Sequence, residues 1–143
     1  MHAKRGPEIV DGNEVLLRHI FPSWLTEEGE PSSQAFYPWR DIDAGCLSVD
    51  RRALVTPADA FARFTSAKPQ GFGQPACEVW GLSVEETRQF ELTSWQDPVE
   101  AADDHPANPT HARVDFNGRS RGQWGKIGKK LKVFAITRKR LHP

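Results

Sequence analysis

All nineteen acidic residues of this 143-residue chain lie before residue 118, and this separation of charge constrains the fold more than any other feature. Residues 1–117 contain ten basic residues beside those nineteen acids, whereas residues 118–143 contain nine basic residues and no acid. The two parts carry net charges of −9 and +9, which cancel over the whole chain. We call residues 1–117 the acidic body and residues 118–143 the basic C-terminal segment. Such asymmetry is typical of a segment that binds phosphate or an acidic surface.

The basic C-terminal segment is open to two interpretations. Its cations could bind an external partner, either nucleic acid or an acidic protein surface, or they could fold onto the acidic body, which attracts them over short distances. The same charge map allows a head-to-tail homo-oligomer that salt would dissociate. The candidate binding residues are Arg119, Arg121, Lys126, Lys129, Lys130, Lys132, Arg138, Lys139 and Arg140.

The basic C-terminal segment also has two possible conformations. On a 3.6-residue wheel its apolar residues form one stripe, which favours an amphipathic helix packed on the body. Gly125 and Gly128 each weaken such a helix by about 1 kcal/mol relative to alanine. The stretch 132–137 could equally form a strand. The stripe consists of Trp124, Ile127, Leu131, Phe134 and Ala135.

The acidic body mixes strand and helix signals without a repeat, which predicts one compact α+β domain with a mixed or antiparallel sheet and two or three helices. Alternating or β-rich stretches predict strands at 14–21, 33–37, 47–50, 77–82 and 111–116. Thr56 and Pro57 predict the start of a helix of about ten residues. Ser83 and Glu86 have the spacing of a capping box, which predicts a second, short helix. The polar, proline-containing stretch 97–110 predicts a surface loop.

Several classes of protein are not expected. The N-terminus has no apolar stretch of a secretory signal, and no window approaches 18 apolar residues, so we expect a cytoplasmic protein with no membrane contact. Cys46 and Cys77 are too few for a disulfide scaffold and form no Cys-x-x-Cys pair. We expect neither a metal nor a cofactor, and a binding protein rather than an enzyme.

Four side chains are weak candidates for catalysis: Arg18, His19, Ser33 and Ser48. In the strand at 14–21, His19 shares its face with three apolar residues, whereas Arg18 points to the other face. A partly buried imidazole is typical of acid–base sites, and also of a core histidine satisfied by one carbonyl. Neither serine lies in a Gly-x-Ser-x-Gly turn, and no Walker or Gly-x-Gly-x-x-Gly pattern is present.

Much of the body resembles a family of small bacterial proteins of uncharacterised function, over roughly residues 15–117. The resemblance implies a bacterial cytosolic protein and draws attention to Ser33, Ser48 and His111. It is carried by the runs Arg18-His19-Ile20-Phe21-Pro22, Ser33-Gln34-Ala35-Phe36, Leu47-Ser48-Val49-Asp50-Arg51, Pro57-Ala58-Asp59-Ala60 and Asn108-Pro109-Thr110-His111-Ala112.

A second, fainter resemblance suggests an alternative function. The run Leu16-Leu17-Arg18-His19 is similar to the opening strand of RNA 2′-phosphotransferases and their ADP-ribosyltransferase-like relatives. This resemblance implies a small transferase that uses NAD or another nucleotide. Arg18 and His19 would lie at the substrate, and the glycine-rich loop at 68–75 would act as a lid.

Overall fold

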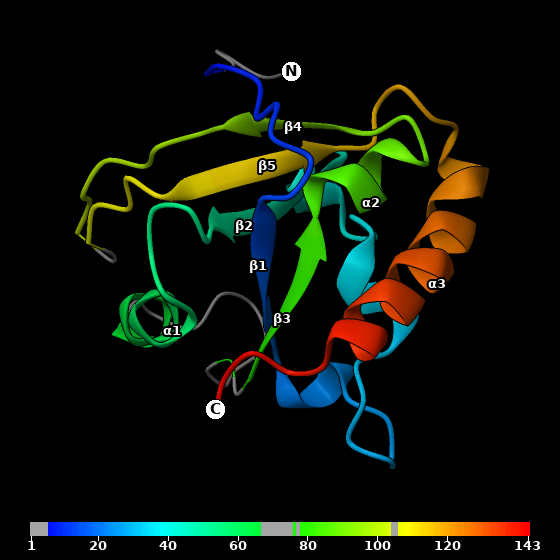
Figure 1. Ribbon diagram of the computed structural model, residues 1–143, viewed down its shortest axis with the longest axis horizontal. Helices are drawn as coiled ribbons and strands as arrows, with labels where there is room; N and C mark the ends of the chain where they lie inside the picture. The colour runs from blue at the N-terminus through cyan, green and yellow to red at the C-terminus, as the bar shows by residue number, and fades with distance from the viewer. Residues whose placement is uncertain (1–5, 67–75, 77, 104–105) are drawn as a thin grey trace.

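The computed structural model describes residues 6–66, 76, 78–103 and 106–143, and its centre is a five-stranded antiparallel sheet (Figure 1). The strand order across the sheet is β3-β1-β2-β5-β4. The strands are β1 (Val15–Ile20), β2 (Cys46–Arg51), β3 (Glu78–Ser83), β4 (Thr93–Gln96) and β5 (His111–Asp115). The helices are α1 (Pro57–Ser66), α2 (Val84–Arg88) and α3 (Arg121–Arg138), with short 3-10 turns η1 (Pro22–Trp24), η2 (Ser33–Phe36) and η3 (Asp41–Asp43). The α+β prediction is confirmed, and every strand pairing is antiparallel.

The two long helices lie on opposite faces of the sheet (Figure 1). This arrangement follows from β1, whose alternate residues face opposite sides. Leu17 packs with Val79 of β3 and Ala60 of α1 in a small apolar cluster. Leu16 and Ile20 belong instead to the main core, which includes the buried residues of α3. The sheet therefore separates the surroundings of α1 from those of α3.

The predicted helix starts are correct because they depend on local chemistry. The hydroxyl of Thr56 accepts a hydrogen bond from the backbone N–H of Asp59, 3.1 Å away, at the start of α1. Ser83 and Glu86 form the reciprocal capping box of α2. Each of these contacts satisfies N–H groups that have no partner within the helix.

The body differs from the sequence predictions in two details. Residues 33–36 form the 3-10 turn η2 rather than a strand, and the neighbouring Ala35 and Phe36 are both buried. Adjacent buried residues do not fit the two-sided alternation of a strand. The strand β4 has no clear sequence signal, because it contains a single large apolar residue, Trp95, and is held by its pairing with β5. The loop at 68–75 and Cys77 lie outside the described residues.

The basic C-terminal segment is helical from Arg121 to Arg138. The helix α3 buries an apolar stripe of Trp124, Ile127, Leu131 and Ala135 against β3 and η2. Burial of large apolar side chains stabilises by about 1.5–3 kcal/mol each. Gly128 lies where α3 crosses η2, and a Cβ there would be 2.5 Å from Cδ1 of Tyr37 and 3.0 Å from the carbonyl oxygen of Ser33. The glycine thus allows the helix to approach η2 closely.

Both chain ends cover an edge of the sheet. Before β1, Ile9 donates to the carbonyl of Ser94 on β4 at 2.8 Å. After α3, the chain turns at Lys139 and runs beside β3, where Val79 donates to the carbonyl of His142 at 2.9 Å. These bonds use backbone groups that would otherwise be open to another strand.

Two glycine substitutions in α3 test this packing. Gly128→Ala is expected to lower the free energy of unfolding by about 1–3 kcal/mol, because the new methyl group has no space against Tyr37 and Ser33. Gly125→Ala is the matched control, because its Cβ would lie 3.9 Å from Tyr37. It is expected to raise the free energy by about 0.5–1 kcal/mol through helix propensity. Urea denaturation measures both, and equal effects of the two substitutions would contradict the packing.

Candidate functional site

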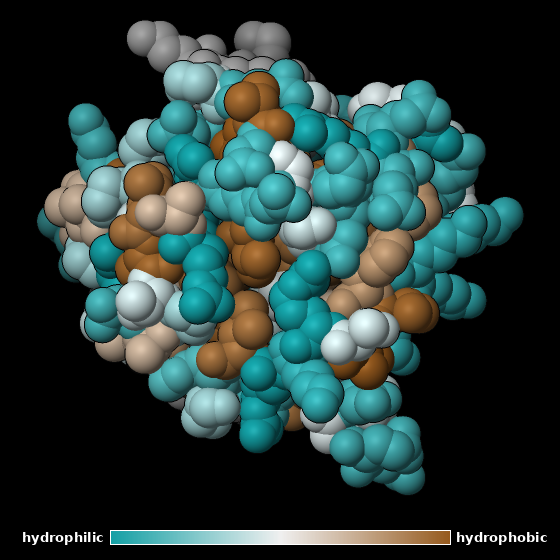
Figure 2. Space-filling view, in the orientation of Figure 1, coloured by the Kyte–Doolittle hydropathy of each residue, from teal (hydrophilic) through white to brown (hydrophobic). Residues whose placement is uncertain are grey.

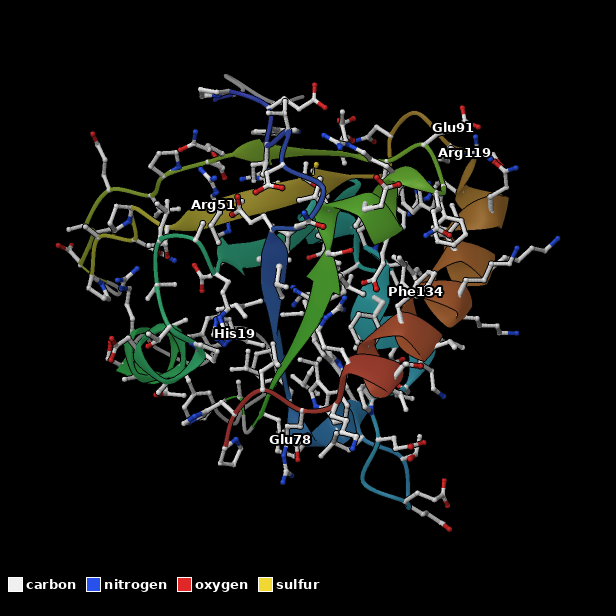
Figure 3. All side chains as sticks on the ribbon, in the orientation of Figure 1. His19, Arg51, Glu78, Glu91, Arg119 and Phe134 are labelled. Carbon is white, nitrogen blue, oxygen red and sulfur yellow. The ribbon has the colours of Figure 1, made fainter. Side chains whose placement is uncertain are left out.

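A buried hydrogen bond between side chains joins β1 and β2 on the face of the sheet that α1 covers. Nε2 of His19 lies 2.8 Å from Oδ2 of Asp50, and each side chain is 5% exposed. Leu17 precedes His19 on the same face of β1 and is aligned with Asp50 of β2 in the sheet. His19 extends from β1 toward α1 (Figure 3). Two residues that are 31 positions apart are thus brought together by the pairing of β1 with β2.

Asp50 accepts hydrogen bonds from three side chains. Besides His19, its Oδ1 accepts from Nδ2 of Asn108 at 2.9 Å and from the hydroxyl of Thr110 at 3.0 Å. Burial by itself raises the pKa of Asp50, but the hydrogen bonds and the charge of His19, with the two further donors, outweigh it and lower the pKa. Asp50 is therefore a carboxylate at neutral pH.

Arg63 of α1 supports the far side of this centre. Its guanidinium donates to the side-chain oxygen of Asn108 and, at 3.0 Å, to the hydroxyl of Thr110. The contacts run without a break from Arg63 through Asn108 and Thr110 to Asp50 and His19. We call these five residues the His19–Asp50 centre. The sequence patterns assign no role to Arg63, Asp50, Asn108 or Thr110, although Asp50, Asn108 and Thr110 lie in the runs that carry the family resemblance.

The ring of His19 is fixed on its other side by an aromatic contact. The ring of Phe64 stacks on it with centroids 4.2 Å apart and planes 10° apart. Because Asp50 is ionised, Nε2 of His19 carries the shared proton. Its other nitrogen, Nδ1, is buried and has no hydrogen-bond partner among the described residues. This arrangement can hold a neutral imidazole with its basic lone pair on Nδ1.

Arg18 lies on the opposite face of β1 and does not join this centre. Its Nε donates to the carbonyl of Ala35 at 2.8 Å and its Nη1 to the carbonyl of Ser48 at 3.0 Å, and its guanidinium lies 5.0 Å from the ring of Trp24. Burial lowers the pKa of Arg18 to about 10, with a partly compensating effect of Asp43. Arg18 is still a cation at neutral pH, and its bonds join β1, β2 and η2.

The two candidate serines are also apart from His19. Ser33 lies in η2, against α3 on the other side of the sheet. Ser48 is exposed on β2 and is aligned with Arg113 of β5. His111, two positions before Arg113, lies 3.1 Å from the carboxylate of Asp97, which Arg113 also contacts. The structure therefore brings none of Arg18, Ser33 and Ser48 to the imidazole.

Four arginines of the basic C-terminal segment contact carboxylates of the acidic body. Arg138 forms a bidentate ion pair with Glu86, in which Nη1 and Nη2 each lie 2.8 Å from a carboxylate oxygen. Its Nη1 also donates to the carbonyl of Gly81. Glu91 and Arg119 lie together near the start of α3, 3.1 Å apart (Figure 3). The remaining pairs are Arg121–Asp41 at 3.5 Å and Arg140–Glu78 at 3.3 Å.

The lysines of this segment behave differently. Lys126, Lys129 and Lys130 have the spacing of one helix face, and all three are exposed. They lie on the side of α3 away from its buried stripe, and in the described parts of the chain no carboxylate lies within ion-pair distance of them. Lys130 has one contact, with its Nζ 5.8 Å from the ring centre of Phe90. Lys132 is half-buried, and Lys139 is exposed where α3 ends.

The described residues include no group of three His, Cys, Asp or Glu side chains that could hold a metal ion. In the same residues, no helix combines the length and apolar character needed to cross a membrane. In comparisons with known proteins, no family model, no curated protein and no solved structure matches the chain. The candidate sites therefore rest on geometry alone.

The lowered pKa of Asp50 predicts how its contribution to stability depends on pH. Asp50→Asn is expected to lower the free energy of unfolding by about 2–3 kcal/mol at pH 7, because a buried, charged acceptor of three hydrogen bonds is lost. The pKa of Asp50 is lower in the folded than in the unfolded chain, where it is about 3.9. The stabilisation is therefore complete above about pH 5 and is lost as the pH falls through the folded-state pKa.

Urea denaturation of both proteins between pH 3 and 7 measures this difference. Asp41→Asn is the control, because Asp41 is 98% exposed and pairs with Arg121 at 3.5 Å. It is expected to change the free energy of unfolding by less than about 0.5 kcal/mol. A difference between wild type and Asp50→Asn that grows as the pH falls would contradict the assignment.

Proposed function

We propose that this protein binds nucleic acid through Lys126, Lys129 and Lys130 on the outward face of α3. The observation that supports the proposal is that the arginines and the lysines of the basic C-terminal segment have different surroundings. The arginines near the two ends of α3 contact acids of the body, whereas the three lysines at its middle contact none. The protein thus keeps three cations on one exposed face, none of them paired with a carboxylate of the described residues.

The position of these lysines costs helix stability. Lys126 and Lys130 are four residues apart, and like charges at this spacing destabilise a helix by about 0.2–0.5 kcal/mol. A phosphate bound between them would relieve the repulsion. Long hydrophilic side chains project beyond the edge of the molecule where α3 lies (Figure 2), so a large polyanion could approach this side.

The composition of the face favours a nucleic acid over an acidic protein. Stable protein interfaces have an apolar or aromatic centre, with arginine enriched and lysine depleted. On the outward face of α3 the one large exposed apolar side chain is Val133. Compact lysine charges without such a centre suit contacts to a phosphate backbone, which are independent of sequence. Because the arginines near the ends of α3 are paired, we expect little discrimination between bases.

A charge-matched pair of variants tests this function. Changing Lys126, Lys129 and Lys130 to Gln removes three cations from the outward face. Changing Arg119, Arg121 and Arg140 to Gln removes three cations that contact the body. Both variants have the same net charge, so a general effect of charge would weaken binding equally. We expect the lysine variant to lose at least tenfold in affinity and the arginine variant to lose less than threefold.

Fluorescence anisotropy with a labelled 20-base-pair DNA duplex, from low to physiological salt, measures the affinity. Three phosphate contacts predict a slope of log affinity against log salt of about −2.7 for wild type. Binding that does not depend on salt, or equal losses in the two variants, would contradict the proposal. Replacement of the three lysines by Arg is expected to restore binding.

A further inference from the structure

We propose that His19 is the proton acceptor of a catalytic site for small uncharged substrates, with Asp50 as its positioning residue and α1 as its cover. This site lies on the face of the sheet opposite to α3 and is independent of nucleic-acid binding. The inference depends on one atom, Nδ1 of His19, which is buried without a hydrogen-bond partner in the described structure. Every other side chain of the His19–Asp50 centre has a hydrogen-bond partner.

Several contacts hold this imidazole in one orientation and one tautomer. Asp50 fixes the proton on Nε2 at 2.8 Å, and Asn108 and Thr110 hold the carboxylate in place. Leaving Nδ1 without a partner costs about 1–3 kcal/mol, which a role in binding a reacting group would explain. A base needs one nitrogen oriented by a carboxylate and the other left for the reacting proton. His19 has this arrangement.

The surroundings of the ring indicate an uncharged substrate. One face of the imidazole is covered by Phe64, and Phe21 packs edge-on against Phe64 with centroids 6.0 Å apart. The cation of the His19–Asp50 centre is Arg63, which donates to Asn108 and Thr110. These two residues and Asp50 connect it to the imidazole, so it does not contact the ring directly. An anionic substrate would have no described counter-charge next to Nδ1, and its desolvation would be costly. A neutral ester or hydroxyl group avoids that cost.

The helix α1 is suited to act as the cover. Of its ten residues, two are buried, Pro57 and Ala60. Its contacts near the site are the stacking of Phe64 on His19, the edge-on contact of Phe64 with Phe21 and the bonds of Arg63. Phe61 and Phe64 pack against the core and are only partly buried. Elements with few buried apolar residues open at low free-energy cost. Outward movement of α1 would expose Nδ1 while the bond between His19 and Asp50 stays within the sheet.

The simplest reaction of such a site is hydrolysis of a neutral ester. A water molecule gives a proton to Nδ1 as its oxygen forms a bond to the carbonyl carbon. The bond from that carbon to the leaving alcohol oxygen then breaks, and the imidazolium returns its proton to the leaving group. The products are one acid and one alcohol, and no other reactant is required. Asp50 stabilises the imidazolium and does not itself take the proton.

The neutral ester p-nitrophenyl acetate and the anionic p-nitrophenyl phosphate are the probes. We expect wild type to release p-nitrophenol from the acetate and not from the phosphate. His19→Gln is expected to lower the rate at least 100-fold, the lower end of the usual contribution of a general base. Asp50→Asn is expected to lower it at least tenfold and to change the pH profile, since the neutral partner no longer fixes the proton on Nε2.

His142→Gln is the matched control. The ring of His142 packs on Phe61 of α1, with centroids 4.8 Å apart, and His142 is not part of the His19–Asp50 centre. Its rate should equal that of wild type. Absence of hydrolysis above the protein-free rate, or equal rates for His19→Gln and wild type, would overturn the proposal.

A second measurement on the wild type keeps the proposal falsifiable if the variants do not fold. Diethyl pyrocarbonate, a neutral electrophile, transfers its ethoxycarbonyl group to an unprotonated imidazole nitrogen and releases ethanol and carbon dioxide. Mass spectrometry of the folded protein is expected to find this group on His19. An unmodified His19 after several half-lives of N-acetylhistidine in the same solution would overturn the proposal.

Discussion

The packing of α3 against η2 and β3 decides which cations of the basic C-terminal segment contact acids of the body. The buried stripe of Trp124, Ile127, Leu131 and Ala135 fixes the rotation of the helix, and the close approach at Gly128 fixes its distance from η2. Once the helix is placed, its terminal arginines meet acids of the body and its central lysines point outward. The charge of the basic C-terminal segment is therefore divided by apolar packing and not by the charges themselves.

On the other face of the sheet, the carboxylate of Asp50 holds the neighbouring elements together. Asp50 joins β1, β2 and the loop before β5 through three side-chain hydrogen bonds, and Arg63 connects that loop to α1. Such a buried charge is stable because its donors replace the water it loses. The same bonds leave one nitrogen of His19 without a partner, so the part of the centre that stabilises the fold also defines its chemistry.

Local chemistry was readable from the sequence, and long-range contacts were not. Thr56 with Pro57 and Ser83 with Glu86 predicted the helix starts, because each cap acts within four residues. The sequence predicts a strand at 33–37, where the structure has η2, because η2 packs against α3, which is distant in the sequence. His19 was a candidate from its face of β1, but Asn108 and Thr110 lie in a polar loop whose path no local pattern specifies. The sequence also does not show that the arginines contact the body while the lysines face solvent, because this depends on how α3 is rotated about its axis.

The most direct test of this account is NMR of the side-chain nitrogens of lysine and arginine during addition of a short DNA duplex at low salt. Assigned Nζ signals report each lysine, and Nε signals report each arginine. The account predicts that Lys126, Lys129 and Lys130 shift together, whereas Arg138, held by both oxygens of Glu86, does not. Shifts centred on Arg138 and Arg140 with unchanged lysines, or no shifts at all, would contradict it.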